Sequence, residues 1–264
     1  CRSRTLHGRT SPRRSAANLA NVGLIPALVG DGALVLTDSL SHASTYAGVT
    51  LSRARAHPFA HNDTDDLRRA LTEHRFAHRH CLLLTEGVFS MDGDRAPLER
   101  LAALAAEFDA WLMVDDAHGL GVLGGGRGSA FEYEPRPRID VQMGTLSKAV
   151  GAYGGFVAAS RPVVDLVRTR ARSLIYSTGL PPPVVAAAIA GLDIIAAEPG
   201  RAAAVLAKAR RFTAALGLPT AESAIVPIVL GESETALSAS AALAERGFLV
   251  TAIRPPTVPQ GTAR

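Results

Sequence analysis

An α/β fold built on a mostly parallel sheet is the fold class that this sequence of 264 residues predicts. Short apolar runs alternate with stretches of helical periodicity, as strands and helices alternate in repeated βαβ units. Hydrophobic residues make up 47% of the chain and charged residues 20%, a balance typical of a folded protein with a sizeable core. Polar side chains gather where the apolar runs end, which is where ligands bind in open parallel sheets.

The predicted elements follow from periodicity and from the residues that start helices. Helix 97–109 carries Leu98, Leu101, Leu104 and Phe108 on one face. Helix 63–79 opens with acidic residues, which favour a helix N-terminus. The predicted strands are Ala33–Thr37, Cys81–Thr85, Trp111–Asp115, Asp140–Thr145, Phe156–Ala159 and Leu174–Tyr176, and the predicted helices are Asp63–Arg79, Pro97–Asp109, Pro162–Arg172 and Pro183–Ala197.

The chain divides at Glu198-Pro199-Gly200, which breaks the helical pattern. We expect a large domain over 15–198 and part of a smaller α+β domain over 199–264. The smaller domain is predicted to contain helices 201–216 and 234–246 and strands 224–230 and 249–253. Residues 1–14 hold five arginines and no acid, so this tail has a charge of +5. The whole chain has a net charge of +4, so residues 15–264 sum to −1. The tail is predicted to be disordered.

Composition also excludes several classes of protein. Two cysteines rule out a disulfide scaffold. No apolar stretch approaches the ~18 residues that span a bilayer, so no membrane partner is expected. The basic tail has no aromatic residue to stack on a base, which argues against nucleic acid. The absence of a signal peptide predicts a cytoplasmic protein. A chain that opens with Cys1 is expected to be a fragment.

Only two of the 28 basic residues are lysines, Lys148 and Lys208. A lysine kept against this background of arginine is a candidate for chemistry that needs a free amine, such as attack on a carbonyl. Lys208 lies among Ala and Arg on a predicted helix and is interpreted as a surface charge.

Four predicted strand ends carry an unusual set of polar groups. Together they supply carboxylates, two imidazoles, hydroxyls and a lysine at one edge of the sheet, a set that suits pyridoxal phosphate. That cofactor needs an amine for a Schiff base and a carboxylate to keep its pyridine nitrogen protonated. The four stretches are Asp38–Ser44, Glu86–Gly93, Asp115–Gly119 and Thr145–Lys148.

These motifs, in this order and spacing, resemble those of the α-oxoamine synthases, which are fold-type I pyridoxal phosphate enzymes. The resemblance extends from about Ser15 to Arg264 and implies a three-layer α/β domain, a smaller C-terminal domain and a homodimer. The stretches that carry it are Ser41–Ser44, Leu51–Ala54, Phe59–Asp63, Glu86–Asp94, Val114–Gly119, Gly144–Lys148, Tyr153–Phe156, Ser177–Pro182 and Ala252–Pro259.

The resemblance also implies a role for each matching residue. Lys148 would carry the cofactor and later move the α-proton of the substrate. Asp115 would hold the pyridinium nitrogen, and His42 would stack on the ring. His118 would bind on the phenolic oxygen side, and Ser90 would hydrogen-bond near the cofactor. Thr145 would bind the phosphate, together with Thr178 from the second subunit.

The expected reaction is the decarboxylative condensation of an amino acid with an acyl thioester. Phe59–Asp63 and Ala252–Pro259 favour the family member that joins L-alanine to a pimeloyl thioester, carried by coenzyme A or acyl carrier protein, in biotin biosynthesis. Two alternatives remain open. One is a sister synthase that uses glycine and another acyl thioester. The other is a truncated, non-catalytic protein that folds or binds cofactor without turnover.

Three further patterns are interpreted as structural. Gly119–Gly124 fits the G-x-G-x-x-G pattern of dinucleotide sites, but the residues that follow are poor helix formers. The pairs His57/His61 and His74/His78 have a spacing that can hold zinc, and we interpret them as surface histidines, so no metal site is predicted. Cys81 opens an apolar strand and is expected to be a buried thiol.

Overall fold

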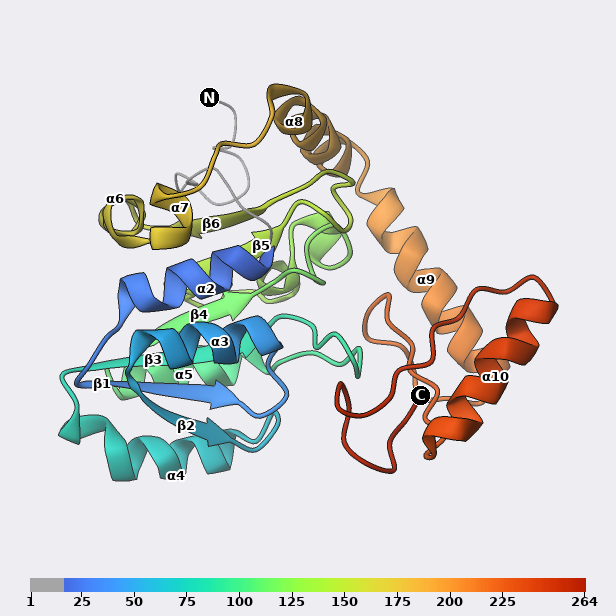
Figure 1. Ribbon diagram of the computed structural model, residues 1–264, viewed down its shortest axis with the longest axis horizontal. Helices are drawn as coiled ribbons and strands as arrows, with labels where there is room; N and C mark the ends of the chain where they lie inside the picture. The colour runs from blue at the N-terminus through green and yellow to red at the C-terminus, as the bar shows by residue number, and fades with distance from the viewer. Residues whose placement is uncertain (1–16) are drawn as a thin grey trace.

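The computed structural model describes residues 17–264 and contains a six-stranded sheet (Figure 1). The strand order is β2-β1-β3-β4-β5-β6, and every neighbouring pair is parallel except β5 and β6. The predicted tail 1–14 lies outside the described residues. The strands are β1 (Ala33–Asp38), β2 (Arg55–Phe59), β3 (His80–Glu86), β4 (Trp111–Asp115), β5 (Val141–Thr145) and β6 (Gly155–Ala159).

Helices cover both faces of this sheet, which confirms the predicted α/β class. α8, α9 and α10 extend beyond the sheet toward the C-terminus (Figure 1). The helices are α2 (Ala17–Leu28), α3 (Ala43–Ser52), α4 (Thr64–His74), α5 (Leu98–Glu107), α6 (Arg161–Arg170), α7 (Arg172–Ile175), α8 (Pro182–Ala197), α9 (Gly200–Ala215) and α10 (Ser233–Glu245).

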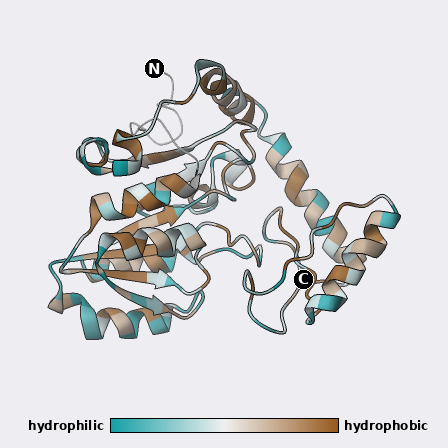
Figure 2. Cartoon of the chain, viewed as in Figure 1, coloured by the Kyte–Doolittle hydropathy of each residue, from teal (hydrophilic) through white to brown (hydrophobic). Residues whose placement is uncertain are grey.

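Two apolar layers form the core because successive side chains of a strand point to opposite faces. In β1, Leu34 and Leu36 pack with the side chains of α4 and α5. Val35, between them, packs with α2, α3 and α6 on the other face. All three are fully buried. Figure 2 shows the hydrophobic residues concentrated in the central strands. Strands buried on both faces explain the continuous apolar runs of the sequence.

Several predicted elements were wrong. Leu174–Tyr176 is not a strand, because residues 172–175 form the short helix α7. The strand β2 was missed because its residues are mostly exposed and include Pro58, as is typical of an edge strand. The helix α3 was missed because its small and β-branched residues have low helix propensity. It is delimited instead by its caps, His42 at the start and Arg53 in a left-handed conformation at the end.

The predicted strands 224–230 and 249–253 are also wrong, since both segments are irregular. A strand needs a neighbour for its backbone hydrogen bonds, and these segments lack a continuous ladder among the described residues. Leu230 bonds Ala263 beside an isolated bridge at Gly231, and Ile253 pairs with Arg264. The predicted helices of this region are present as α9 and α10. The division into two domains at Glu198–Gly200 stays a prediction.

Two side chains tie the C-terminal part of the chain to the loop that follows β3. The hydroxyl of Ser223 donates to the carbonyl of Gly93 at 2.7 Å. The guanidinium of Arg264 bonds the carboxylate of Asp92 at 2.6 Å and the carbonyl of Met91 at 3.0 Å. These contacts hold residues 223–264 against the edge of the sheet where the polar strand ends lie.

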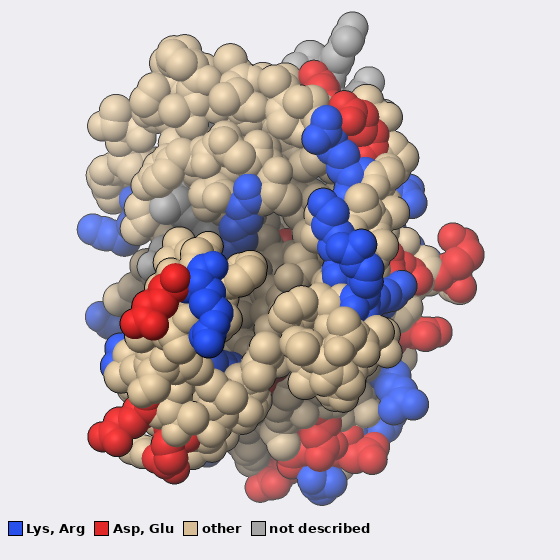
Figure 3. Space-filling view, turned by 90° about the vertical axis from the view of Figure 1, so that its right-hand side faces the viewer, with Lys and Arg blue, Asp and Glu red and all other residues tan. Residues whose placement is uncertain are grey.

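The surface over α8 is apolar. Its residues include Ile189, which is 55% exposed, and Ile194, which is 46% exposed. In the view onto this side of the molecule the upper surface, where α8 lies, is mostly uncharged, and Lys and Arg form a line along one side (Figure 3). No single helix among the described residues is long and apolar enough to cross a membrane; α8 and α9 meet that test only as a pair bent by 77°.

Arg75 is a buried cation that closes the end of α5. Its guanidinium donates to the carbonyls of Phe108 and His78, each at 2.8 Å, and of Asp109 at 2.7 Å. Truncation leaves these buried acceptors without donors, so we expect Arg75→Ala to lower the free energy of unfolding by about 3 kcal/mol in urea titrations. Arg69→Ala is the control, since the 68%-exposed Arg69 pairs with Asp66 and should cost at most about 1 kcal/mol. Equal losses for the two variants would contradict this role of Arg75.

Candidate functional site

Four adjacent strands deliver the predicted polar groups to one edge of the sheet. β1, β3, β4 and β5 are consecutive in the sheet and mutually parallel, so their carboxyl ends meet. The order in which strands are added to the sheet reverses here, because β2 lies on one side of β1 and β3 on the other. Such a switch point is where parallel sheets bind ligands. The predicted gathering of these strand ends is therefore confirmed.

Lys148 and His118 form the centre of the site. The Nζ atom of Lys148 lies 2.7 Å from Nε2 of His118, although the two residues are 30 positions apart. Burial lowers the pKa of His118 to about 4, and the charge of Lys148 contributes to the shift, so this imidazole is neutral and accepts a hydrogen bond from Lys148. Burial also lowers the pKa of Lys148. The lowered pKa of Lys148 brings the lysine closer to the free amine that nucleophilic chemistry needs.

Asp115 ends β4 as a buried carboxylate with a donor on each oxygen. Its Oδ2 accepts from Nδ2 of Asn21 at 2.8 Å, and its Oδ1 accepts from the backbone N–H of Ala117 at 3.0 Å. Burial raises the pKa of Asp115, whereas these hydrogen bonds and the charges of Lys148 and His42 oppose that rise. The two donors hold the carboxylate in one orientation.

His42 lies on the turn after β1 and begins α3. Its Nδ1 accepts from the backbone N–H of Ser44 at 3.1 Å and contacts the Ser44 hydroxyl at 2.7 Å. The backbone N–H of His42 donates to the carboxylate of Glu86 at the end of β3. The His42 side chain is exposed, while its nitrogen is held in place by the helix cap. An aromatic ring is therefore available at the mouth of the site.

The three predicted hydroxyl residues lie in different places. Thr145 is buried at the end of β5, where its Oγ1 bonds the Ser147 hydroxyl at 2.8 Å and the Gly154 carbonyl at 3.1 Å. Ser90 is half-buried in the loop after β3. Thr178 is exposed on the segment between α7 and α8, and within the described residues no hydrogen bond joins it to the other site residues. Roles for all three stay predictions.

Two functional candidates, Asn21 and Glu86, were not among the predicted site residues. Asn21 is fully buried in α2 and contacts Ser44 as well as Asp115, which is 94 residues away. Its Oδ1 atom has no partner in the described residues. Amide residues, Asn18 and Asn21, among the apolar residues of that helix were the available signal. The sequence places Glu86 at a predicted strand end. Only the register of β3 with β4, in which Glu86 pairs with Asp115, shows that the two carboxylates are neighbours.

Asp116, the next residue after Asp115, has a different role. It is buried among glycines, such that a Cβ at Gly119 would lie 2.0 Å from its Oδ1. The backbone N–H of Ser129 donates to it at 3.0 Å and the Ser129 hydroxyl at 2.6 Å. Burial raises the pKa of Asp116 to about 7. Asp116 thus holds the glycine-rich loop in place, while Asp115 lies at the edge of the sheet with the other polar site residues.

The glycine motif and Cys81 are also accounted for by the structure. The glycines of 119–124 lead into a single 3₁₀ turn over Gly124–Gly126, not into the α-helix that a dinucleotide site requires. Cys81 is 4% exposed in β3, and burial raises the pKa of its thiol to about 12, so it is an inert core residue.

Three of the four histidines of the two predicted pairs lie close together, and His61 lies apart. His57 and His74 stack with ring centroids 4.8 Å apart, and Nδ1 of His78 lies 2.9 Å from the carbonyl of His74. His61 does not join this cluster. Both of its ring nitrogens contact carboxylates, one at the end of β1 and one on the loop after β3.

Comparison with known proteins assigns the family. The model of the class I and II aminotransferases matches residues 16–264. The chain belongs to this family. It is 59% identical to the 8-amino-7-oxononanoate synthase of Methylocella silvestris over 93% of this chain and 70% of that protein. It is 58% identical to the 8-amino-7-oxononanoate synthase of Methylorubrum extorquens, over 93% and 62%. The family resemblance predicted from the motifs is confirmed, and the relatives at 58–59% identity carry the name of the favoured member.

Solved structures agree on the fold. Serine palmitoyltransferase from S. paucimobilis, with a bound PLP–myriocin aldimine, superimposes with a TM-score of 0.93 at 35% identity, covering 98% of this chain and 67% of that one. The 8-amino-7-oxononanoate synthase of Francisella tularensis matches with a TM-score of 0.81 at 24% identity, over 98% and 76%, and supports the fold alone. The chain spans between 62% and 70% of the length of the curated relatives it matches.

Glu86 gives the folded protein a specific dependence on pH. Burial raises its pKa to about 8, and the adjacent Asp115 adds to the rise. The folded state therefore binds the proton more tightly than the unfolded chain, whose carboxyl has a pKa of about 4.5. The resulting stabilisation is complete below pH 4.5 and is lost as pH rises through about 8.

Glu86→Gln tests this dependence because it keeps an oxygen for the N–H of His42 and removes the titration. We expect wild type to lose free energy of unfolding relative to the variant between about pH 5 and about pH 8, measured by urea titration. Parallel stability curves for the two proteins over that range would show that Glu86 titrates in the same way in both states.

Proposed function

We propose that this chain carries the cofactor site of an 8-amino-7-oxononanoate synthase. The reaction joins L-alanine to a pimeloyl thioester and releases carbon dioxide and the free thiol. The observation that carries the proposal is the 2.7 Å contact between Lys148 Nζ and His118 Nε2 at a sheet edge that also holds the buried Asp115. The names of the relatives at 58–59% identity give the product, 8-amino-7-oxononanoate. The substrates are those that the motif resemblance implies.

The donor set fits pyridoxal phosphate. Lys148 offers an amine with a lowered pKa, and Asp115 offers a buried carboxylate whose orientation is held by Asn21. The exposed ring of His42 can lie against a flat heterocycle, and Thr145 brings a hydroxyl to the end of β5. When bound, the cofactor supplies an electron sink for the carbanion formed at the α-carbon of the amino acid.

Each side chain then has a defined task. Lys148 would hold the cofactor covalently, and its free amine would take the proton from the α-carbon of alanine. His118, neutral because of burial, accepts a hydrogen bond from Nζ and keeps the amine aimed. Asp115 would keep the pyridine nitrogen protonated. The α-carbon would then attack the thioester carbonyl and the thiolate would leave. Loss of the carboxylate as carbon dioxide, followed by return of a proton to the α-carbon, would give the amino-ketone.

A homodimer belongs to the same proposal. Thr178 is exposed and lies on the segment that leads into the apolar, exposed helix α8. A second copy packed on α8 would bring its own Thr178 to the phosphate near Thr145. Sedimentation of the cofactor-bound protein checks the dimer, and a monomer with full cofactor affinity would contradict it. The cytoplasmic location expected from the sequence stays a prediction.

The test of the function is turnover with defined substrates. The protein is saturated with pyridoxal phosphate and supplied with L-alanine and pimeloyl-coenzyme A or pimeloyl-acyl carrier protein, and the product is identified by mass spectrometry. We expect 8-amino-7-oxononanoate, with glycine and serine as poor replacements for alanine. Preference for glycine with another acyl thioester would assign a sister synthase. Cofactor binding without any condensation would assign a non-catalytic protein.

A further inference from the structure

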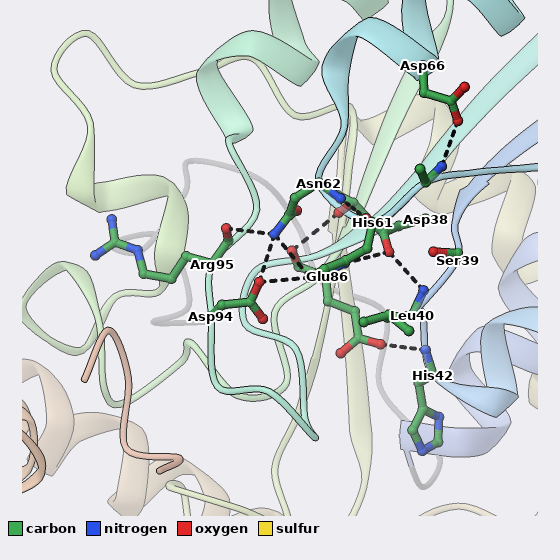
Figure 4. A network of polar contacts seen from close by, with 12 residues as sticks. Asp38, Ser39, Leu40, His42, His61, Asn62, Asp66, Glu86, Asp94 and Arg95 are labelled. Carbon is green, nitrogen blue, oxygen red and sulfur yellow. Dashed lines mark hydrogen bonds and ion pairs between the residues drawn. The ribbon is translucent and has the colours of Figure 1, made fainter. Parts of the chain in front are cut away.

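His61 bonds two carboxylates from different parts of the chain. Its Nδ1 lies 2.9 Å from Oδ1 of Asp38, and its Nε2 lies 2.8 Å from Oδ2 of Asp94 (Figure 4). Ionised carboxylates only accept hydrogen bonds, so both ring nitrogens must carry a proton. Burial by itself lowers the pKa of His61, but the hydrogen bonds with Asp38 and Asp94 outweigh it and raise the pKa to about 10. His61 is therefore a permanent imidazolium near neutral pH.

The first carboxylate shapes the turn that carries His42. Asp38 ends β1 and is fully buried. Its Oδ1 also accepts from the backbone N–H of Leu40 at 2.9 Å, and its Oδ2 accepts from the backbone N–H of Asn62 at 2.8 Å. The N–H of Ser41 bonds the Asp38 carbonyl at 3.0 Å. The contacts from Leu40 and Ser41 thus fold the chain back onto Asp38 directly before His42, and the contact from Asn62 joins the segment of His61 to the same carboxylate.

The second carboxylate lies on the loop that carries Ser90. Val88 and Arg95 close this loop as a bridge, and the N–H of Phe89 bonds the Asp94 carbonyl at 3.0 Å. The ring of Phe89 packs edge-on against the His61 ring, with centroids 4.4 Å apart. Asn62 strengthens the same connection, because its Nδ2 donates to Asp94 at 2.9 Å.

We propose that His61 is a positioning residue: it joins the turn that carries His42 to the loop that carries Ser90, and so sets the spacing of two side chains at the cofactor site. The inference rests on the proposed function only for the identity of the ligand. The joining of the two segments is a property of the protein itself. Charge-assisted bonds on both nitrogens make this joint stronger than a neutral pair would.

The first experiment measures, without cofactor, how strongly His61 holds the two segments together. Its readout is amide hydrogen exchange, followed by mass spectrometry. His61→Gln keeps two polar atoms but presents an oxygen to one carboxylate, so we expect faster exchange in both segments 39–44 and 88–95. Asp94→Ala, which keeps the bond to Asp38, should speed exchange in 88–95 alone. His57→Gln is the matched control and should change neither segment, since the His57 ring lies against His74 and bonds the Pro58 carbonyl, outside both segments. Unchanged exchange in either segment of His61→Gln would overturn the proposal.

The second experiment measures the consequence for pyridoxal phosphate. We expect His61→Gln to bind it about tenfold more weakly. The visible circular dichroism band of the bound cofactor should also weaken, because the cofactor ring is no longer held in one orientation. In the double variant His61→Gln/Asp94→Asn the two amides can pair, and affinity should recover to within about threefold of wild type. A lower melting temperature with unchanged affinity and dichroism would mean that His61 only stabilises the fold, and would overturn the positioning role.

The two experiments separate the possible failures. If wild type binds no pyridoxal phosphate, the proposed function fails and the exchange data still decide whether His61 joins the two segments. If His61→Gln does not fold, nitrogen NMR of the wild-type imidazole decides. Both ring nitrogens should remain protonated at about pH 8, well above the ordinary pKa of about 6.5. A singly protonated ring at that pH would break one of the two bonds and overturn the proposal.

Discussion

Lys148→Ala should abolish covalent attachment of pyridoxal phosphate. The wild-type protein mixed with the cofactor should develop a visible absorbance band and, after borohydride treatment, a stable adduct on Lys148. The variant has no amine at the carboxyl edge of the sheet, so both signals should disappear. Turnover of alanine should fall at least about 10³-fold, because the same amine moves the α-proton.

The chain offers an unusually clean control for this experiment. Its only other lysine is Lys208, exposed on α9. Lys208→Ala should keep the band, the adduct and the turnover of wild type. Lys148→Arg should behave like Lys148→Ala, since a guanidinium keeps the charge but does not act as a free amine. A borohydride-stable adduct on the Lys148→Ala protein would refute the assignment of Lys148.

Asp115→Asn should separate cofactor binding from proton abstraction. A neutral amide cannot hold the charge of a pyridinium, so the cofactor loses its power as an electron sink. We expect exchange of the alanine α-proton with deuterated solvent, followed by NMR, to slow by about 100-fold. Cofactor affinity should change much less, because Lys148 still provides the covalent attachment.

The surroundings of Asp115 make its replacement more severe than charge loss alone. Both oxygens accept from an N–H, one from Asn21 and one from Ala117. An amide in this position must turn its own NH₂ toward one of these donors, which costs a buried hydrogen bond and tilts the group. Asp31→Asn, at an exposed carboxylate on the turn before β1, is the control and should leave exchange unchanged. Wild-type exchange rates in Asp115→Asn would refute its role.

The edge of the sheet was predictable because each strand and its polar residues are contiguous in the chain. Asp115 directly follows an apolar run, and Lys148 comes three residues after one, so the local pattern already placed both at strand ends. The strands 224–230 and 249–253 show the limit of the same method. Their composition favours strands, but no described neighbour completes their hydrogen bonds, and the segments are irregular.

The sequence by itself determined the α/β class, most of the helices and strands and the residues at the strand ends, because these depend on local periodicity and motif spacing. Only the tertiary structure decided which of those residues meet. It brought Asn21 to Asp115 across 94 positions, His118 to Lys148 across 30, and His61 to two carboxylates 23 and 33 positions away. It also decided the ionisation of Glu86, His118 and His61. A pKa depends on burial and on facing charges, and these exist only once distant segments of the chain have packed together.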